Sequence, residues 1–189
     1  AQAAGIMSRQ NSIAARRRVV LLLTGLLAFS GAGAEPVRIL PLGDSITHGY
    51  WSGIGTNHYN SYRKTLKSLL EENGHAADFT GSLADGDFSD NQHEGHDGWY
   101  AGHATKTNTV LGHVAGWMAE TRADVVLLHI GTNDIIDGSD EADAEDVAQI
   151  LDEIYAANGK ASVVLALIIN TRTDYARRSE VSAYNGNLS

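Results

Sequence analysis

The 189-residue sequence contains no cysteine, only two prolines, and fewer basic than acidic residues. The absence of cysteine excludes disulfide bonds, thiol catalysis and metal sites built on thiolates, so the fold must rely on its hydrophobic core. The 14 lysines and arginines are outnumbered by 23 aspartates and glutamates, which gives a net charge of −9. An acidic chain is a poor partner for nucleic acid or anionic lipid and is better suited to a neutral substrate such as a polysaccharide.

The first 34 residues differ in composition from the rest and predict a secretory signal peptide. Arg16-Arg17-Arg18 precedes the 11-residue apolar run 19–29, and Ala32-Gly33-Ala34 offers the small residues that a signal peptidase accepts. The run is shorter than the roughly 20 residues of a membrane-spanning helix. We therefore expect cleavage after Ala34 and a secreted or periplasmic protein with no membrane contact. Cleavage would remove four arginines and no acidic residue, changing the net charge from −9 to −13.

The remaining residues, 35–189, predict a single α/β domain. Apolar strands alternate with amphipathic helices, which is typical of a doubly wound, flavodoxin-like parallel sheet between two layers of helices. The strands are apolar throughout, which indicates a sheet covered on both faces. A long loop rich in glycine, aspartate and histidine is expected at 83–103, and its length favours a functional role. We expect strands at 37–42, 76–79, 125–130 and 162–169, and helices at 61–73, 107–121, 139–158 and 176–188.

Two of the predicted strands end in polar turns. The first runs into Gly43-Asp44-Ser45, and the strand at 125–130 runs into Gly131-Thr132-Asn133-Asp134. Either stretch alone is typical of a helix cap or a tight turn. Ligands of parallel sheets bind at the carboxyl ends of the strands, so two such turns are expected to face one cleft. A third polar stretch, His93-Glu-Gly-His-Asp-Gly-Trp99, lies between them in the sequence.

These three stretches, in this order, resemble the blocks of the SGNH (GDSL-type) hydrolase family over most of residues 37–189. The resemblance implies the α/β fold described above and a serine esterase that needs no cofactor. By motif, it implies that Ser45 is the nucleophile and that its backbone N–H belongs to the oxyanion hole. Gly98 would supply a second N–H and Asn133 a side-chain amide. Such preformed donors are what a tetrahedral oxyanion requires.

The resemblance also suggests roles for neighbouring residues. Asp44 and Asp134 are expected to be structural partners that fix the two turns. Gly81 and Gly95 lie near Gly98 in the sequence and could compete with it as the oxyanion donor. Glycines in such a loop can equally serve only to permit positive φ angles.

Within the family, the sequence is most similar to secreted carbohydrate esterases that deacetylate xylan, on the strength of the stretches 93–99 and 128–134. This resemblance implies acetylated polysaccharide as the substrate and an acyl-serine intermediate. A lipase, lysophospholipase or thioesterase of the same family is a second hypothesis, although the acidic composition disfavours a lipid-facing surface. A non-catalytic carbohydrate-binding module is a third. The oligomeric state is left open.

One block of the family is missing from the sequence. An Asp-x-x-His near the C-terminus supplies the general base and the residue that orients it, and no such block is present. All eight histidines precede the strand expected at 162–169. We therefore expect the chain to be a fragment, truncated before the last block and inactive by itself.

A metal site in the loop at 83–103 is an alternative role for three of the histidines, His93, His96 and His103. Their spacing on a loop is not diagnostic, and no carboxylate is clearly placed to complete a site. We expect no metal there.

Overall fold

The computed structural model of the protein describes residues 35–50, 58–137, 144–169 and 178–188. The predicted signal peptide lies outside these residues. No helix within the described ranges is long and apolar enough to cross a membrane.

The central strand of the sheet is β1 (Val37–Gly43), whose last five residues are all buried. Along one edge it pairs in parallel with β5 (Val125–His129), and β5 pairs in parallel with β6 (Ser162–Leu165). The strands predicted at 37–42 and 125–130 are therefore confirmed. Their continuous apolar character follows from their central position, since both faces of β1 are covered.

The other edge of β1 is shared by two short strands. β2 (Ala77–Phe79) pairs in parallel with the beginning of β1, and β4 (Gln92–Gly95) pairs in parallel with its end. β3 (Leu83–Ala84) lies antiparallel to β4. The sheet is thus mostly parallel, with its strand order reversing at β1.

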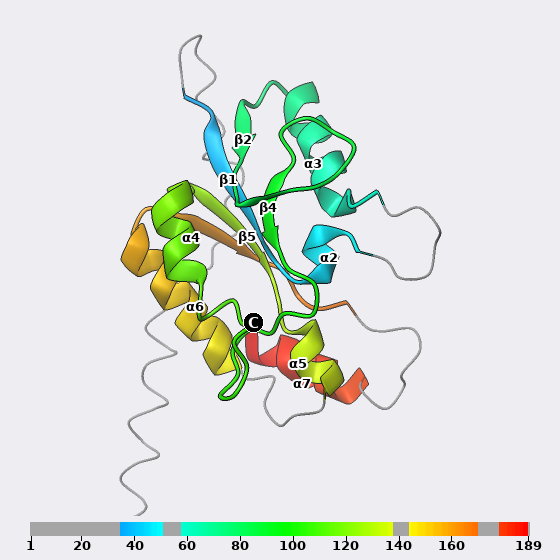
Figure 1. The fold of residues 1–189 in the computed structure, drawn as a ribbon, viewed down its shortest axis with the longest axis vertical. Coiled ribbons are helices and arrows are strands. Elements are labelled where there is room, and N and C mark those ends of the chain that lie inside the picture. Colours follow the sequence, from blue (N-terminus) through cyan, green and yellow to red (C-terminus); the bar gives the residue numbers. More distant parts are fainter. Residues whose placement is uncertain (1–34, 51–57, 138–143, 170–177, 189) are drawn as a thin grey trace, which may run out of the picture.

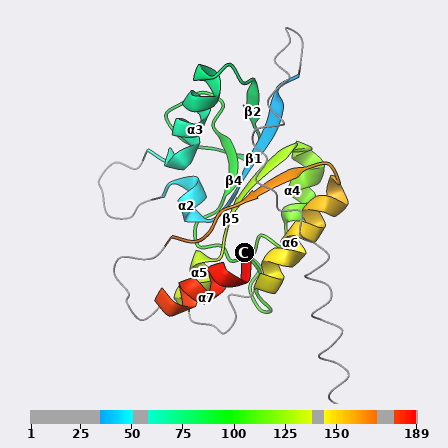
Figure 2. The same cartoon turned by 180° about the vertical axis from the view of Figure 1, so that it is seen from behind.

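Helices pack on both faces of this sheet, as Figures 1 and 2 show. On one face α4 and α6 bury apolar side chains against Leu40 and Leu42 of β1, whereas on the other Lys67 of α3 lies over the Phe79 ring of β2. The fold is therefore the predicted doubly wound α/β architecture. Its helices are α2 (Ser45–His48), α3 (Ser61–Glu72), α4 (Val114–Thr121), α5 (Thr132–Asp137), α6 (Ala144–Ala157) and α7 (Arg178–Leu188).

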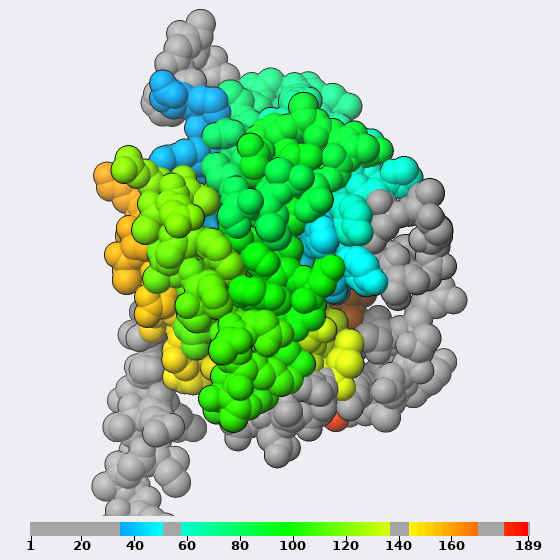
Figure 3. Space-filling view, viewed as in Figure 1, coloured from blue at the N-terminus to red at the C-terminus, as the bar shows by residue number. Residues whose placement is uncertain are grey.

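The prediction of a loop over 83–103 is wrong in one respect, because β3 and β4 lie within this range. The sequence of β4, Gln-His-Glu-Gly, carries no apolar pattern, although His93 and Glu94 are both fully buried. Local hydrogen bonds compensate for this burial. Glu94 accepts from the backbone and side chain of Ser82 and contacts the His96 ring at 2.8 Å, and the His93 ring accepts from Gly95 N–H at 2.9 Å. In the space-filling view, the green segment that includes this region covers much of the visible face (Figure 3).

The helix expected at 107–121 begins only at Val114. Residues before it bond to a neighbouring segment instead, since Val110 N–H donates to Tyr100 O and Leu111 N–H to Ala101 O, both at 2.9 Å. Val110 is fully buried by this arrangement. Val110 therefore reaches the core from the segment before α4 rather than from a helix.

The strand expected at 162–169 is also shorter and less buried than predicted. β6 ends at Leu165, and the side chains of its residues that pack against the core are Val163 and Leu165. Val164 is 39% exposed, and Leu167 and Ile169 beyond the strand are 53% and 67% exposed. Within the described sheet β6 is an edge strand, and a continuous apolar run does not distinguish an edge from a centre.

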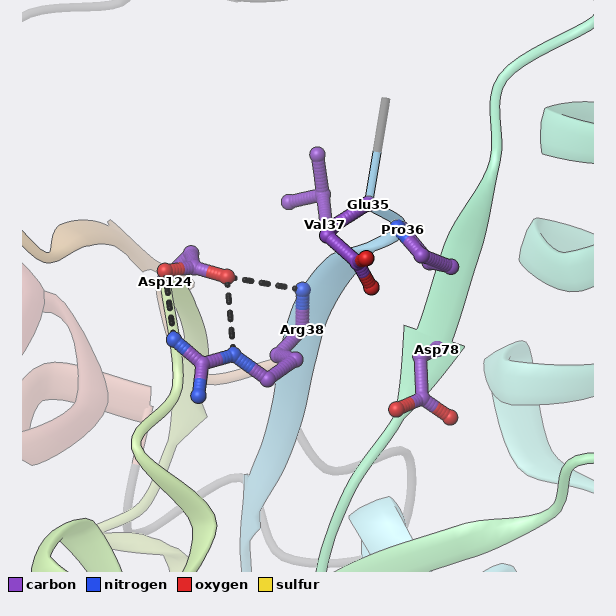
Figure 4. Close-up of a pocket in the computed structure, with 6 residues that line it drawn as sticks. All are labelled: Glu35, Pro36, Val37, Arg38, Asp78 and Asp124. Atoms are coloured by element: carbon purple, nitrogen blue, oxygen red, sulfur yellow. Dashed lines mark hydrogen bonds and ion pairs between the residues drawn. The ribbon is translucent and has the colours of Figure 1, made fainter. Parts of the chain in front are cut away.

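At the end of the sheet where β1 begins, a hollow of about 420 Å³ is lined by residues that include Arg38 and Asp124 (Figure 4). The Arg38 guanidinium donates twice to the Asp124 carboxylate, at 3.0 and 3.1 Å, and so joins β1 to the start of β5. None of the predicted site residues lies here.

Candidate active site

Three strand ends meet in register at the opposite end of β1. Gly43, its last residue, pairs with Gly95 of β4 on one side and with His129 of β5 on the other. Ser45 follows Gly43 by two residues, Gly98 follows Gly95 by three, and Asn133 follows His129 by four. The pairing therefore brings all three predicted site residues to one edge of the sheet.

The turn that carries Ser45 is tightly constrained. A Cβ atom on Gly43 would lie 2.0 Å from the carbonyl oxygen of His129, so no other residue fits without moving β5. Asp44 then caps α2, since its Oδ1 accepts from Ile46 N–H at 2.9 Å. Ser45 is the first residue of α2 and is half-buried at this strand-to-helix turn.

Asp44 itself is fully buried, which raises the pKa of its carboxyl. The hydrogen bond from Ile46 N–H and the neighbouring His129 offset part of this rise. The side chain thus lies beneath the turn and contacts its backbone. A structural role for Asp44, as the resemblance implies, stays a prediction.

Asn133 and Asp134 lie in the first turn of α5 and join it to the segment around Gly98. The Asn133 amide donates to Trp99 O at 2.8 Å, and the Asp134 carboxylate accepts from Ala101 N–H at 3.0 and 3.2 Å. An asparagine amide has two N–H groups, so one remains for a ligand. Burial raises the pKa of Asp134 to about 6, and the backbone bond from Ala101 offsets part of that rise.

Of the three candidate glycines, Gly98 best fits the oxyanion donor. It has φ +72°, an added Cβ would meet no atom within 4 Å, and its N–H donates to no other described residue. The N–H of Gly95 is used by the His93 ring. Gly81 packs against the backbone of His93, before β4 ends. Which N–H binds the oxyanion stays a prediction.

Sequence reasoning did not identify Tyr184, which supports the second turn. From α7 this buried side chain donates its hydroxyl to Ile130 O at 3.0 Å. Gly131 has φ +114°, and a Cβ there would lie 2.3 Å from the Tyr184 hydroxyl. The helix was predicted from its pattern, but no sequence signal indicates which tyrosine meets a turn so distant along the chain.

All eight histidines lie within the described residues, and none forms a hydrogen bond with the Ser45 hydroxyl. His48, on the same short helix, instead bonds to Asp97 at 2.9 Å. His129 is adjacent to the turn, but both of its ring nitrogens are buried and have no partner among the described residues. A general base for Ser45 is therefore not in place within the described structure.

One cluster brings together three potential metal ligands, His48, Asp85 and His93, whose nearest atoms all lie within 4.8 Å of one another. It differs from the trio considered from sequence, of which only His93 is a member. Burial, and then Arg63, lowers the pKa of His93 to about 3, so its ring is neutral. Its Nδ1 accepts from Gly95 N–H, so its Nε2 carries the proton. A ligating nitrogen needs a lone pair, so this arrangement does not fit a metal ion.

A serine at a strand-to-helix turn, with a glycine N–H and an asparagine amide just beyond the two neighbouring strand ends, fits a serine-hydrolase type of site on a doubly wound sheet. Residues 42–188 match the sequence profile of the GDSL-like lipase/acylhydrolase family. The chain belongs to this family.

Similar proteins support the same assignment. A multidomain esterase of Ruminococcus flavefaciens is 29% identical over 150 residues, which cover 68% of this chain. The match spans only 19% of that esterase, about a fifth of its length.

Solved structures give a similar result. The family 3 carbohydrate esterase of Clostridium thermocellum has a TM-score of 0.66 at 28% identity, covering 82% of this chain and 69% of that one. A family 3 carbohydrate esterase from Talaromyces cellulolyticus has a TM-score of 0.64 at 27% identity, covering 80% and 70%.

Proposed function

We propose that the protein is a serine esterase in which Ser45 is acylated during turnover. The observation that carries this proposal is the register of β4, β1 and β5, which brings Ser45, Gly98 and Asn133 to one edge of the sheet. In this mechanism the Ser45 oxygen attacks the ester carbonyl carbon, and the resulting oxyanion accepts from the N–H groups of Ser45 and Gly98 and from the Asn133 amide.

The tetrahedral intermediate then collapses to an acyl-serine. Its C–O bond to the alcohol breaks, and the alcohol takes up a proton as it departs. Water attacks the acyl carbon, and the carboxylic acid departs as the Ser45 hydroxyl regains its proton. Both steps need a base that accepts a proton and returns it. Because no histidine bonds to Ser45, we propose that an Asp-x-x-His block outside these 189 residues supplies that base.

The proposed substrate is an O-acetyl ester of a neutral plant polysaccharide such as xylan. Two carbohydrate esterases are among the similar solved structures, and another of them is an acetyl esterase with a TM-score of 0.64 at 26% identity. The net charge of −9 also suits a neutral ligand. A lipase or thioesterase remains the second candidate, because the matching family includes lipases.

Acyl-chain preference would test the proposal. The protein encoded by the complete gene should hydrolyse p-nitrophenyl acetate with a higher kcat/KM than the octanoate or palmitate ester, and should release acetate from acetylated xylan. Preference for palmitate would favour the lipase. Binding of xylan with no hydrolysis of any ester would favour the carbohydrate-binding module.

We also propose that the protein is exported from the cytoplasm. The arginine cluster, apolar run and Ala32-Gly33-Ala34 occur in the order that a signal peptidase requires. N-terminal sequencing of protein collected outside the cytoplasm should therefore begin at Glu35. Protein that keeps its N-terminal residues inside the cell would contradict this.

A further inference from the structure

Arg63 in α3 is a charged side chain with no exposed surface. Arginine is almost never fully buried unless it is paired. No carboxylate of the described residues forms a salt bridge with it. Burial lowers the pKa of Arg63 to about 10, so the guanidinium stays charged at neutral pH. Its charge must therefore be compensated by other contacts.

Five backbone carbonyl oxygens provide that compensation. The Arg63 Nε donates to Thr47 O at 3.0 Å, and one terminal nitrogen donates to His48 O, also at 3.0 Å. Thr47 and His48 are the last two residues of α2, the helix that begins with Ser45. The remaining acceptors are Tyr59 O, Asp85 O and Asn91 O, in segments that flank α3 and β4.

The helix α2 has only four residues, too few to be stable by itself. Each of its carbonyls nevertheless has a donor. Ser45 O accepts from Gly49 and Tyr50 N–H at 2.8 and 3.0 Å, whereas Ile46 O accepts from the Ser61 hydroxyl of α3. Arg63 binds the other two. Three of the four carbonyls of α2 are thus held by side chains of α3, which satisfies backbone groups that a helix C-terminus would otherwise leave unpaired.

We propose that Arg63 is a positioning residue for Ser45. Its guanidinium fixes α2 against α3 and β4, and thereby sets where the Ser45 hydroxyl and N–H lie relative to Gly98 and Asn133. Arg63 acts through the backbone of α2 and does not touch the substrate. This inference rests on the proposed catalytic role of Ser45.

The contact pattern requires a guanidinium rather than a positive charge alone. Arginine offers five N–H donors spread over three nitrogens in a plane, whereas lysine offers three donors on one nitrogen. A lysine ammonium cannot reach Thr47 O and Asn91 O on opposite sides of the fork at once. We call the hydrogen bonds from Arg63 to Thr47 O and His48 O the α2 clamp. Small displacements of reacting groups can lower rates by about 10²-fold. Loss of the clamp should therefore reduce kcat, whereas KM, which reports substrate contacts, should change little.

The test compares Arg63→Lys and Arg63→Ala with the unaltered protein encoded by the complete gene. The assay is p-nitrophenyl acetate hydrolysis, together with the unfolding temperature and hydrogen exchange of the Gly49 and Tyr50 amides. We expect kcat to fall roughly 10-fold in Arg63→Lys and roughly 10²-fold in Arg63→Ala, with KM within about two-fold. Millimolar guanidinium or ethylguanidinium should restore part of the kcat of Arg63→Ala. Lys64→Ala is the matched control, because this exposed residue of α3 pairs with Asp87 and should leave kcat unchanged.

The outcomes separate the two proposals. If Arg63→Ala stays folded with an unchanged kcat, or if its lost activity follows only the unfolded fraction and no guanidinium restores it, the positioning role is wrong. If Arg63→Ala does not fold, Arg63→Lys provides the test: a lower kcat with an unchanged KM supports the positioning role, and an unchanged kcat contradicts it. If Ser45→Ala keeps full activity, the proposed function fails. Exchange of the Gly49 and Tyr50 amides would then still judge the clamp, since faster exchange in Arg63→Ala supports it and unchanged exchange contradicts it.

Discussion

Asn133 and Asp134 are adjacent in the sequence but have different tasks in the structure. Asn133 reaches Trp99 O with one amide hydrogen and keeps a second for a ligand, whereas Asp134 is buried beneath Ala101. The first residue is therefore expected to affect the reaction, and the second the stability of the fold and its dependence on pH.

Asn133→Ala should lower kcat by roughly 10²–10³ with little change in KM, because an oxyanion donor acts mainly in the transition state. Steady-state kinetics with p-nitrophenyl acetate on the complete protein would measure this. Asn108→Ala is the control, since the Asn108 amide holds the same loop through Gly98 O at 2.9 Å. Equal losses in both variants, or a loss confined to KM, would make Asn133 a loop-fixing or substrate-binding residue.

Asp134 predicts a pH dependence of stability. Its pKa is raised from 3.8 to about 6 in the folded protein, so below about pH 4 it is protonated in both states. As the pH rises from about 4 through 6, the unfolded chain ionises while the folded carboxyl keeps its proton, so about 3 kcal/mol of stability is lost. Asp134→Asn cannot ionise and should escape this loss. The unfolding temperature of the variant minus that of the unaltered protein should therefore increase by several degrees between pH 4 and 7. A constant difference would show that Asp134 is not buried as described.

At the level of elements, the strands that the sequence predicts well are those with a continuous apolar run, such as β1 and β5. The strand β4 could not be predicted, because its buried His93 and Glu94 are compensated by hydrogen bonds from Ser82, Gly95 and His96. Such compensation is a property of the folded arrangement and leaves no periodic pattern in the sequence. The edge position of β6 could not be predicted for a similar reason, since whether a strand is covered depends on which other elements pack beside it in the folded protein.

The candidate site also contains residues that the sequence predicts and residues that it does not. Ser45, Asn133 and Gly98 stand out through motif resemblance, and the strand register places them at one edge. Arg63 and Tyr184 do not stand out, because an arginine and a tyrosine on amphipathic helices look like ordinary surface or core residues. Only the folded structure shows that they bind the backbone of the two turns.

The contact between α7 and the second turn can be tested at Gly131. Gly131→Ala should destabilise the fold by about 1–3 kcal/mol, because its φ of +114° strains any side chain and its Cβ would lie 2.3 Å from the Tyr184 hydroxyl. Chemical denaturation would measure the loss. Gly186→Ala on α7, where nothing lies within 4 Å of the added Cβ, is the control and should not destabilise. If Gly131→Ala were no more destabilising than Gly186→Ala, the close contact between the second turn and Tyr184 would be contradicted.

At the level of the whole molecule, the described structure contains the proposed nucleophile and the proposed oxyanion donors, but among its residues no histidine bonds to Ser45. The curated esterase that it resembles is about five times as long as the matched part. A serine hydroxyl without a base stays protonated at neutral pH, and loss of triad members typically lowers kcat on the order of 10⁴–10⁶-fold. Activity should therefore depend on residues beyond the 189.

The most direct test of this account is the rate of p-nitrophenyl acetate hydrolysis by the 189-residue chain and by its Ser45→Ala variant, beside the same pair made from the complete gene. We expect the two short proteins to be equally slow and the complete protein to lose its activity on Ser45→Ala. If the 189-residue chain turned over at an ordinary enzyme rate, roughly 1–10³ per second, and Ser45→Ala abolished it, one of its own histidines would be the base and this account of the active site would be wrong.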